Sequence, residues 1–314
     1  MKGLIAAVLT VALAASARAQ SSLDAAFEMG RALRSAPSAA KMGREEPTAK
    51  AVLRFPAPPE AAAPDKYDDG NDDFRRALLD WKRSDRWFVP TGLGGVMLVI
   101  EKGYIDDARL DRLCADLREA VFAIPRLTGR PPLIRARFTV YVYDQGPSSK
   151  EDVPGLRPGE RGLMLRTVKN DAEPLFHEMT HLLAGYSDSW SLGEGIADWV
   201  QARERPGRAY AFVPANTNPD AMAKAALARR PAAFGALIGA PGREINDNSD
   251  RDVRRDFYYC SWSFVSFLIR QGDMKAFWLV ADAGGKPEAY QAAYGKSFTA
   301  LHAAWIEELS RAAP

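Results

Sequence analysis

The sequence has no excess of charge of either sign and no long hydrophobic run beyond its first residues. Lys2 and Arg18 are two of the 42 basic residues, so the chain from residue 20 onward has 40 basic and 40 acidic side chains. That balance argues against a nucleic-acid-binding protein, which needs a concentrated basic face. No segment in this part approaches the ~18 apolar residues of a membrane-spanning helix, so we expect no stable insertion into a membrane.

Cysteine and histidine are scarce. The only two cysteines, Cys114 and Cys260, either form one disulfide or remain two separate buried thiols, and the sequence leaves both open because it does not give the distance between them. Of the 3 histidines, two lie four residues apart, at His177 and His181, and the third is His302. A metal site at the first pair is therefore expected to take its third ligand from a carboxylate rather than from the distant histidine.

The N-terminal residues are typical of a secretory signal peptide. Residues 1–19 combine a basic residue near the start, a short apolar run and a small-residue triplet that ends at Ala19. We therefore expect cleavage before Gln20 and export to the periplasm or the medium. Residues 20–73 are rich in Ala and Pro, offer little large apolar surface, and are expected to form a flexible leader or a wrapped extension.

The rest of the chain has the pattern of an α+β fold. A mixed α/β lobe is expected over residues 74–203 and a mostly helical lobe over residues 204–314, packed as one compact unit or as two lobes. In the first lobe, the sequence patterns predict strands at residues 96–100, 137–144 and 161–168 and a helix at residues 105–124. Further helices are expected in the second lobe, at residues 257–272, 273–284, 287–295 and 298–311.

A His-Glu-x-x-His motif lies on a predicted helix that has Asp171 as its N-cap and Gly185 at its end. Residues four apart share a helix face, so the imidazoles of His177 and His181 point the same way and form half of a tetrahedral zinc site. Glu178 lies about 100° round the helix from the first histidine. It is therefore close to the ion without binding it, and is the candidate general base for a catalytic water. The alternative is an ordinary helix with two unrelated histidines and a solvated glutamate.

A third zinc ligand is expected from the following segment, LGEGIADWV. Glu194 is the candidate ligand, and Asp198, four residues later on the same helix face, is the candidate acceptor for the second ring N–H of a ligating histidine. In the alternative, Glu194 forms a capping box with Ser191 and binds only a backbone N–H, which leaves Asp198 solvated. Asp188 is a substitute ligand.

The two motifs together resemble the gluzincin metallopeptidases, and more closely the peptidase MA-like family, which is similar to the plant basic secretory protein peptidases. The downstream segments YYCSWSFVSFLIRQG and AAYGKSFTALHAAWIEELSR also resemble helices of that family, so the resemblance covers about residues 135–312. It implies a zincin-like fold, Zn²⁺ as cofactor and hydrolysis of a peptide or protein substrate. His177, His181 and Glu194 would then be the ligands, with Glu178 as general base.

The resemblance also requires a donor for the oxyanion formed in the reaction. Tyr258, in a Tyr-x-x-Ser-Trp pattern, is the candidate catalytic donor, and a core tyrosine is the alternative. His302 is expected to be structural. By analogy with the fold, residues 161–168 are the edge strand along which an extended substrate lies. The alternative function is a non-catalytic protein that binds zinc, a peptide or a surface polymer on the same fold.

Overall fold

The computed structural model describes the greater part of the chain. The described residues are 53–55, 80, 82–144, 149–157, 159–211, 213–230 and 250–311. The expected signal peptide, residues 1–19, lies outside them. Of the expected leader, residues 20–73, only residues 53–55 are described, and they form a strand paired with residues 86–88. Within the described residues, no helix is long and apolar enough to cross a membrane.

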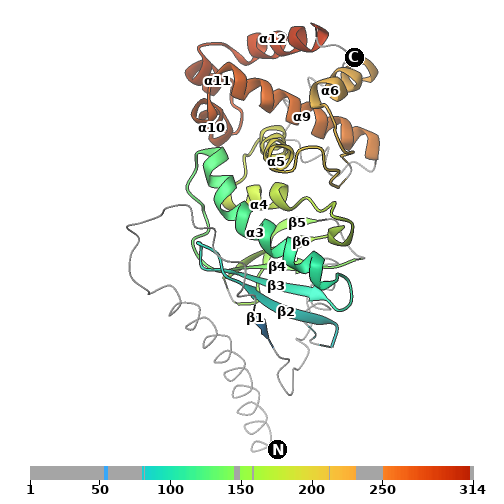
Figure 1. Cartoon of the computed structure of the whole chain (residues 1–314). Coiled ribbons are helices and arrows are strands. Elements are labelled where there is room, and N and C mark those ends of the chain that lie inside the picture. Colours follow the sequence, from blue (N-terminus) through green and yellow to red (C-terminus); the bar gives the residue numbers. More distant parts are fainter. Residues whose placement is uncertain are drawn as a thin grey trace, which may run out of the picture.

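Six strands of the described residues form one mixed sheet in the order β1-β2-β3-β4-β6-β5 (Figure 1). The strands are β1 (Leu53–Phe55), β2 (Ser84–Val89), β3 (Val96–Glu101), β4 (Phe138–Val142), β5 (Lys150–Pro154) and β6 (Arg161–Leu165). In the centre, β3, β4 and β6 run parallel, while β1, β2 and β5 pair antiparallel at the two sides. The helix that carries the His-Glu-x-x-His motif packs against β5 and β6 of this sheet.

The prediction that residues 161–168 form an edge strand is wrong. This segment forms β6, which is internal because β5 pairs with its outer side. The sequence of β5, KEDVP, is charged and ends in proline, so it has no alternating apolar pattern. Charge and proline are common on edge strands because they discourage pairing with further strands. The edge strand therefore lacks the pattern that marks a strand in the sequence.

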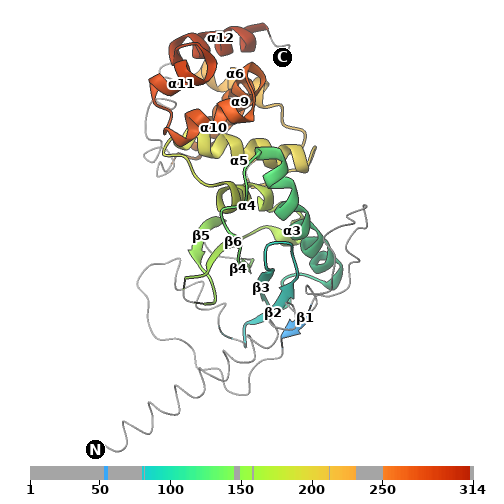
Figure 2. The same ribbon diagram turned by 90° about the vertical axis from the view of Figure 1, so that its left-hand side faces the viewer.

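Helices form most of the remaining described chain. They are α3 (Asp107–Thr128), η1 (Val168–Asn170), α4 (Leu175–Ala184), α5 (Trp190–Glu204), α6 (Pro219–Arg229), α9 (Arg251–Gln271), α10 (Met274–Asp282), α11 (Pro287–Tyr294) and α12 (Phe298–Arg311). Figures 1 and 2 show α3 and α4 on one side of the sheet, α5 beyond α4, and the last helices beyond α5. The α+β prediction is confirmed: a mixed sheet with its helices is followed by a mostly helical region.

One continuous core joins the sheet to the last helix. Leu98 of β3 and Leu182 of α4 belong to the same buried cluster, which extends to Trp305 of α12. Side chains alternate between the two faces of a strand, and Val99 and Tyr141 accordingly belong to a second, smaller cluster on the opposite face of the sheet. The candidate site lies where α4 and α5 pass through the larger core.

The two cysteines are free thiols, Cys114 in α3 and Cys260 in α9, and both are buried. The disulfide alternative is therefore wrong, and the alternative of two separate buried thiols is confirmed. Burial raises the pKa of Cys114 to about 12 and also raises the pKa of Cys260. Both side chains are therefore neutral thiols near neutral pH.

Candidate metal centre

Helix α4 carries the His-Glu-x-x-His motif, and all of its residues are buried. Its N-cap is Pro174, so the expected cap at Asp171 is wrong. Asp171 instead follows η1 in a left-handed conformation with φ of 58°, and its carboxylate pairs with Arg208 at 2.9 Å. The helix ends at Gly185, as expected, and this glycine has a φ of 93° that favours a residue without Cβ.

The start of α4 is held by a side chain of α5. Gln201 Oε1 accepts the backbone N–H of Phe176 at 2.8 Å and that of His177 at 3.1 Å. The first N–H groups of a helix have no partner within the helix, so a side-chain acceptor satisfies them and fixes the helix start. The backbone of His177 is therefore anchored to the same helix that carries Glu194.

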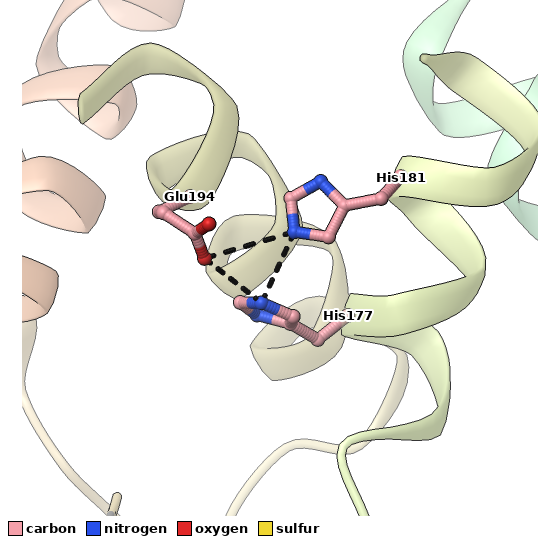
Figure 3. Close-up of side chains that lie close together, drawn as sticks. All are labelled: His177, His181 and Glu194. Carbon is pink, nitrogen blue, oxygen red and sulfur yellow. Dashed lines mark hydrogen bonds and ion pairs between the residues drawn. The ribbon is translucent and has the colours of Figure 1, made fainter. Parts of the chain in front are cut away.

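Three potential ligand atoms meet between α4 and α5 (Figure 3). His177 Nε2 lies 3.2 Å from His181 Nε2 and 3.1 Å from Glu194 Oε2, and His181 Nε2 lies 3.6 Å from that oxygen. Zinc bonds of about 2.0–2.1 Å at a tetrahedral angle require ligand atoms about 3.3–3.4 Å apart. The observed separations lie on both sides of this value, so the donor set fits a cation of this size.

Asp198 lies behind the first imidazole. Its Oδ1 is 2.8 Å from His177 Nδ1 and also accepts a hydrogen bond from the hydroxyl of Tyr210 at 3.2 Å. A carboxylate only accepts, so Nδ1 carries a proton toward Asp198, and Nε2 is the nitrogen that would give its lone pair to a cation once its own proton is lost. The structure therefore places the side chain of Asp198 where it selects the tautomer suited to metal binding.

The capping-box alternative for Glu194 is wrong. The N-cap of α5 is Ser189 and makes no capping hydrogen bond with its side chain, while the Ser191 hydroxyl lies 3.1 Å from that of Ser189. Glu194 and Asp198 are both buried, with 2% of each exposed, so neither is a solvated surface residue. Asp188 is exposed and lies against Gly284, outside the ligand group.

Tyr186, which the sequence patterns do not single out, contacts two members of the group. Its hydroxyl donates to Glu194 Oε1 at 2.7 Å. Its ring stacks on the imidazole of His181, with centroids 4.3 Å apart and planes 18° apart. A tyrosine in the short loop between α4 and α5 has no periodic pattern, and only its position directly after Gly185 marks it as close to the motif.

The charges of the centre act on one another. Burial alone would raise the pKa of Glu194, but the two imidazoles hold it below its usual value. Burial alone would lower the pKa of His177, but the neighbouring carboxylates, Asp198 first, raise it well above its usual value. Burial raises the pKa of Asp198. Two buried carboxylates beside two imidazoles favour a positive charge between them, which a divalent cation supplies.

The two remaining catalytic candidates lie on different elements. Glu178 is a buried residue of α4 with 6% exposed. Burial raises the pKa of Tyr143, just after β4, and the charge of Glu178 adds to that rise. Tyr258 of α9 is partly buried, and its ring centroid is 6.3 Å from that of His177. The structure thus brings a tyrosine from the helical region next to the motif.

His302 does not belong to the group. It lies on α12 among aromatic rings, with centroid distances of 5.7 Å to Phe298, 5.6 Å to Trp305 and 6.5 Å to Phe264. Burial lowers its pKa. It is partly buried against aromatic rings, which agrees with the structural role expected for it.

A second group of three carboxylates lies beside the start of α4. Each is paired with an arginine, as Arg205–Asp116 at 2.5 Å, Arg208–Asp171 at 2.9 Å and Arg109–Glu173. These guanidinium groups supply the positive charge that a buried cation would otherwise provide. We assign this group a structural role, because it ties α3 and the end of α5 to the residues that precede α4.

Comparisons with known proteins give no relative: no family model matches the chain, and no curated protein or solved structure matches it significantly. The buried group of His177, His181 and Glu194 on two neighbouring helices is a candidate metal site, compatible with a zincin motif.

Proposed function

We propose that this chain is a zinc metallopeptidase of the gluzincin type that hydrolyses peptide bonds in a peptide or protein substrate. The observation that carries the proposal is the spacing of 3.1–3.6 Å among His177 Nε2, His181 Nε2 and Glu194 Oε2, which suits tetrahedral zinc. Three protein ligands are typical of a catalytic site, because they leave one position for water, whereas structural sites use four.

His177, His181 and Glu194 would hold the zinc. When bound, zinc supplies Lewis acidity that lowers the pKa of a water toward neutrality and polarises a carbonyl group. Glu178, the next residue on α4, accepts the proton of the attacking water and passes it to the leaving amine nitrogen. The hydroxyl of Tyr258 donates a hydrogen bond to the carbonyl oxygen as that oxygen gains negative charge.

The position of the edge strand, β5, supports a peptide substrate. β5 pairs with β6 on one side, ends the strand order of the described sheet and packs against α4. An extended peptide binds to such an edge by adding a strand, with backbone hydrogen bonds that do not depend on its sequence. The substrate backbone would then lie beside the helix that carries Glu178.

The proposal includes export of the enzyme. Its support is the sequence of residues 1–19, which has the charge, apolar run and small-residue triplet of a secretory signal peptide.

Replacing Glu178 with Gln tests the proposal. The zinc-loaded wild-type chain is expected to cleave a general protein substrate, to lose activity with a chelator and to regain it with zinc. Glu178→Gln is expected to bind stoichiometric zinc and to lose at least about 100-fold in kcat, because the amide cannot accept the proton. Glu288→Gln, the same change at an exposed residue of α11, is the control and should keep full activity.

Two results would contradict the proposal. Full activity of Glu178→Gln would exclude this glutamate as the base. Stoichiometric zinc in a wild-type chain that cleaves no protein substrate would favour the non-catalytic zinc-binding or peptide-binding protein.

A further inference from the structure

The two candidate histidine ligands, His177 and His181, differ in the neighbours that fix their imidazole rings. His177 is held by Asp198 at Nδ1 and by Gln201 at its backbone. By contrast, His181 Nδ1 is buried and has no hydrogen-bond partner among the described residues. An imidazole without such a partner needs another contact to fix its ring plane, because the partner of the second nitrogen normally sets the orientation of a ligating histidine.

Tyr186 supplies that contact. Its ring stacks on the imidazole of His181 and forms a T-shaped pair with the ring of Trp190, with centroids 5.7 Å apart. The loop is anchored to the helical region, because the Ser187 hydroxyl donates to the carbonyl oxygen of Ala281 in α10 at 2.6 Å. The tyrosine ring therefore holds a defined position over the second imidazole.

The same tyrosine binds the carboxylate. Its hydroxyl donates to Glu194 Oε1, while Glu194 Oε2 faces both Nε2 atoms. A carboxylate rotates about its last bond unless a partner fixes one oxygen, and a free carboxylate binds a metal through either one or both oxygens. The hydrogen bond at Oε1 leaves only Oε2 directed to the point between the histidines.

We propose that Tyr186 is a positioning residue of the metal centre: its hydroxyl makes Glu194 a one-oxygen ligand, and its ring fixes the plane of His181. The inference rests on the metal binding contained in the proposed function and is independent of peptide hydrolysis. Tyr186 is 38% exposed, so its position is explained better by these two contacts than by burial of its ring.

The test separates the hydroxyl from the ring. Tyr186→Phe keeps the stacking and removes the hydrogen bond, and Tyr186→Leu removes both. We expect the zinc dissociation constant, measured by competition with a chromophoric chelator, to rise about 10-fold in Tyr186→Phe and further in Tyr186→Leu, as is typical when the partner of a metal ligand is removed. Tyr294→Phe is the control, because this hydroxyl on α11 has no hydrogen-bond partner among the described residues.

Cobalt provides a second readout that a purely structural role would not change. With Co²⁺ in place of zinc, visible absorption weakens as the coordination number rises. If Tyr186→Phe frees Glu194 to bind through both oxygens, its Co²⁺ complex absorbs more weakly than that of the wild-type chain, while Tyr294→Phe keeps the wild-type spectrum.

The outcomes distinguish this inference from the proposed function. A zinc affinity within twofold of wild type together with an unchanged cobalt spectrum in Tyr186→Phe overturns the positioning role. A wild-type chain that binds no zinc overturns both the role and the enzyme. If zinc binds without peptide hydrolysis, only the peptidase assignment fails, because the two binding measurements do not use turnover.

Discussion

At the scale of single residues, each donor of the candidate centre depends on a neighbour that does not bind the ion. Asp198 accepts from Nδ1 of His177, so Nε2 is the nitrogen left to bind an ion at the centre. Tyr210 donates to the same carboxylate oxygen at 3.2 Å and limits its movement. A site of this kind depends on its partners almost as strongly as on its ligands, because the partner fixes both the tautomer and the ring plane.

Asp198→Asn tests this dependence. The amide offers a weaker, uncharged acceptor and can instead present its N–H₂ to Nδ1, which favours the tautomer with the proton on Nε2. We expect the zinc dissociation constant to rise about 10- to 100-fold, measured by chelator competition. Asp188→Asn is the matched control at an exposed residue and should bind zinc as the wild type does. Equal affinities for the two variants would show that the contact between Asp198 and His177 is irrelevant to the metal.

The sequence identifies the residues with helical spacing and misses those without it. His177, His181, Glu194 and Asp198 stand at intervals of four on two helices, so their shared faces follow from the helix period. Gln201 follows Asp198 by three residues, and the same period would have placed it on the face turned to α4. Tyr186 lies in a loop, where the backbone path decides the direction of a side chain, and no sequence period applies.

At the scale of elements, the position of α5 between two helices determines where Glu194 lies. α5 packs against α4 on one side and α9 on the other. Gly195, next to Glu194, allows the close approach to α9: a Cβ atom at this position would lie 2.4 Å from the carbonyl oxygen of Ser261 and 2.6 Å from a methyl group of Val265. The glycine in the GEGIAD segment therefore has a packing role beside the ligand.

Gly195→Ala is expected to destabilise the metal-free chain by roughly 1–3 kcal/mol, because α5 and α9 must move apart to admit the methyl group. Gly193→Ala on the same helix is the control: its Cβ atom would lie 3.4 Å from the ring of Tyr186, an ordinary contact. That change should be neutral, or stabilising by up to about 1 kcal/mol, since alanine favours helix. Urea denaturation gives both free energies of unfolding, and similar values would contradict the close-packing argument.

The elements differ in how well their sequences predict them. β3 and β4 are buried on both faces, and their sequences are correspondingly apolar and rich in β-branched residues. α9 to α12 have clear helical periods. Both patterns are therefore recognisable in the sequence. β5 is charged, and β1 has 3 residues, too few for a period. The short helix α6 is rich in alanine and buries only two of its residues, so its apolar stripe is weak. Order within the sheet depends on long-range pairing, and no local pattern contains it.

At the scale of the whole molecule, the sheet region and the helical region share one core. A single buried cluster includes Val140 of β4, Leu182 of α4, Phe264 of α9 and Trp305 of α12. Arg130 strengthens the junction: it donates to the carbonyl oxygen of Ala184 at the end of α4, and it stacks on the indole of Trp278 in α10 at 3.9 Å. Elements that share one continuous apolar core usually unfold in a single transition, so we expect the two regions to unfold cooperatively.

The two cysteines allow a test of this cooperativity, because one lies in each region. Cys114 in α3 and Cys260 in α9 are each 1% exposed, and burial raises both pKa values, so native thiols should not react with a thiol reagent at pH 8. Cys114→Ala and Cys260→Ala each leave one reporter. In metal-free protein, thiol labelling is expected to follow the circular dichroism transition of the same variant across the urea range, since each thiol becomes reactive only when the shared core opens.

Separate unfolding of the helical region would contradict this expectation. If Cys260 becomes reactive at lower urea while Cys114 and most of the secondary structure remain protected, the helical region unfolds on its own and the two regions are separate lobes. Bound zinc must be removed first, because an ion held by residues of α4 and α5 stabilises the folded state by mass action and would mask separate unfolding of the helical region. A reductant should leave the midpoints unchanged in the wild-type chain, because no disulfide joins the two thiols. Coincident transitions would mean that Tyr258 of α9 is held beside His177 by the stability of the whole fold rather than by a movable lobe.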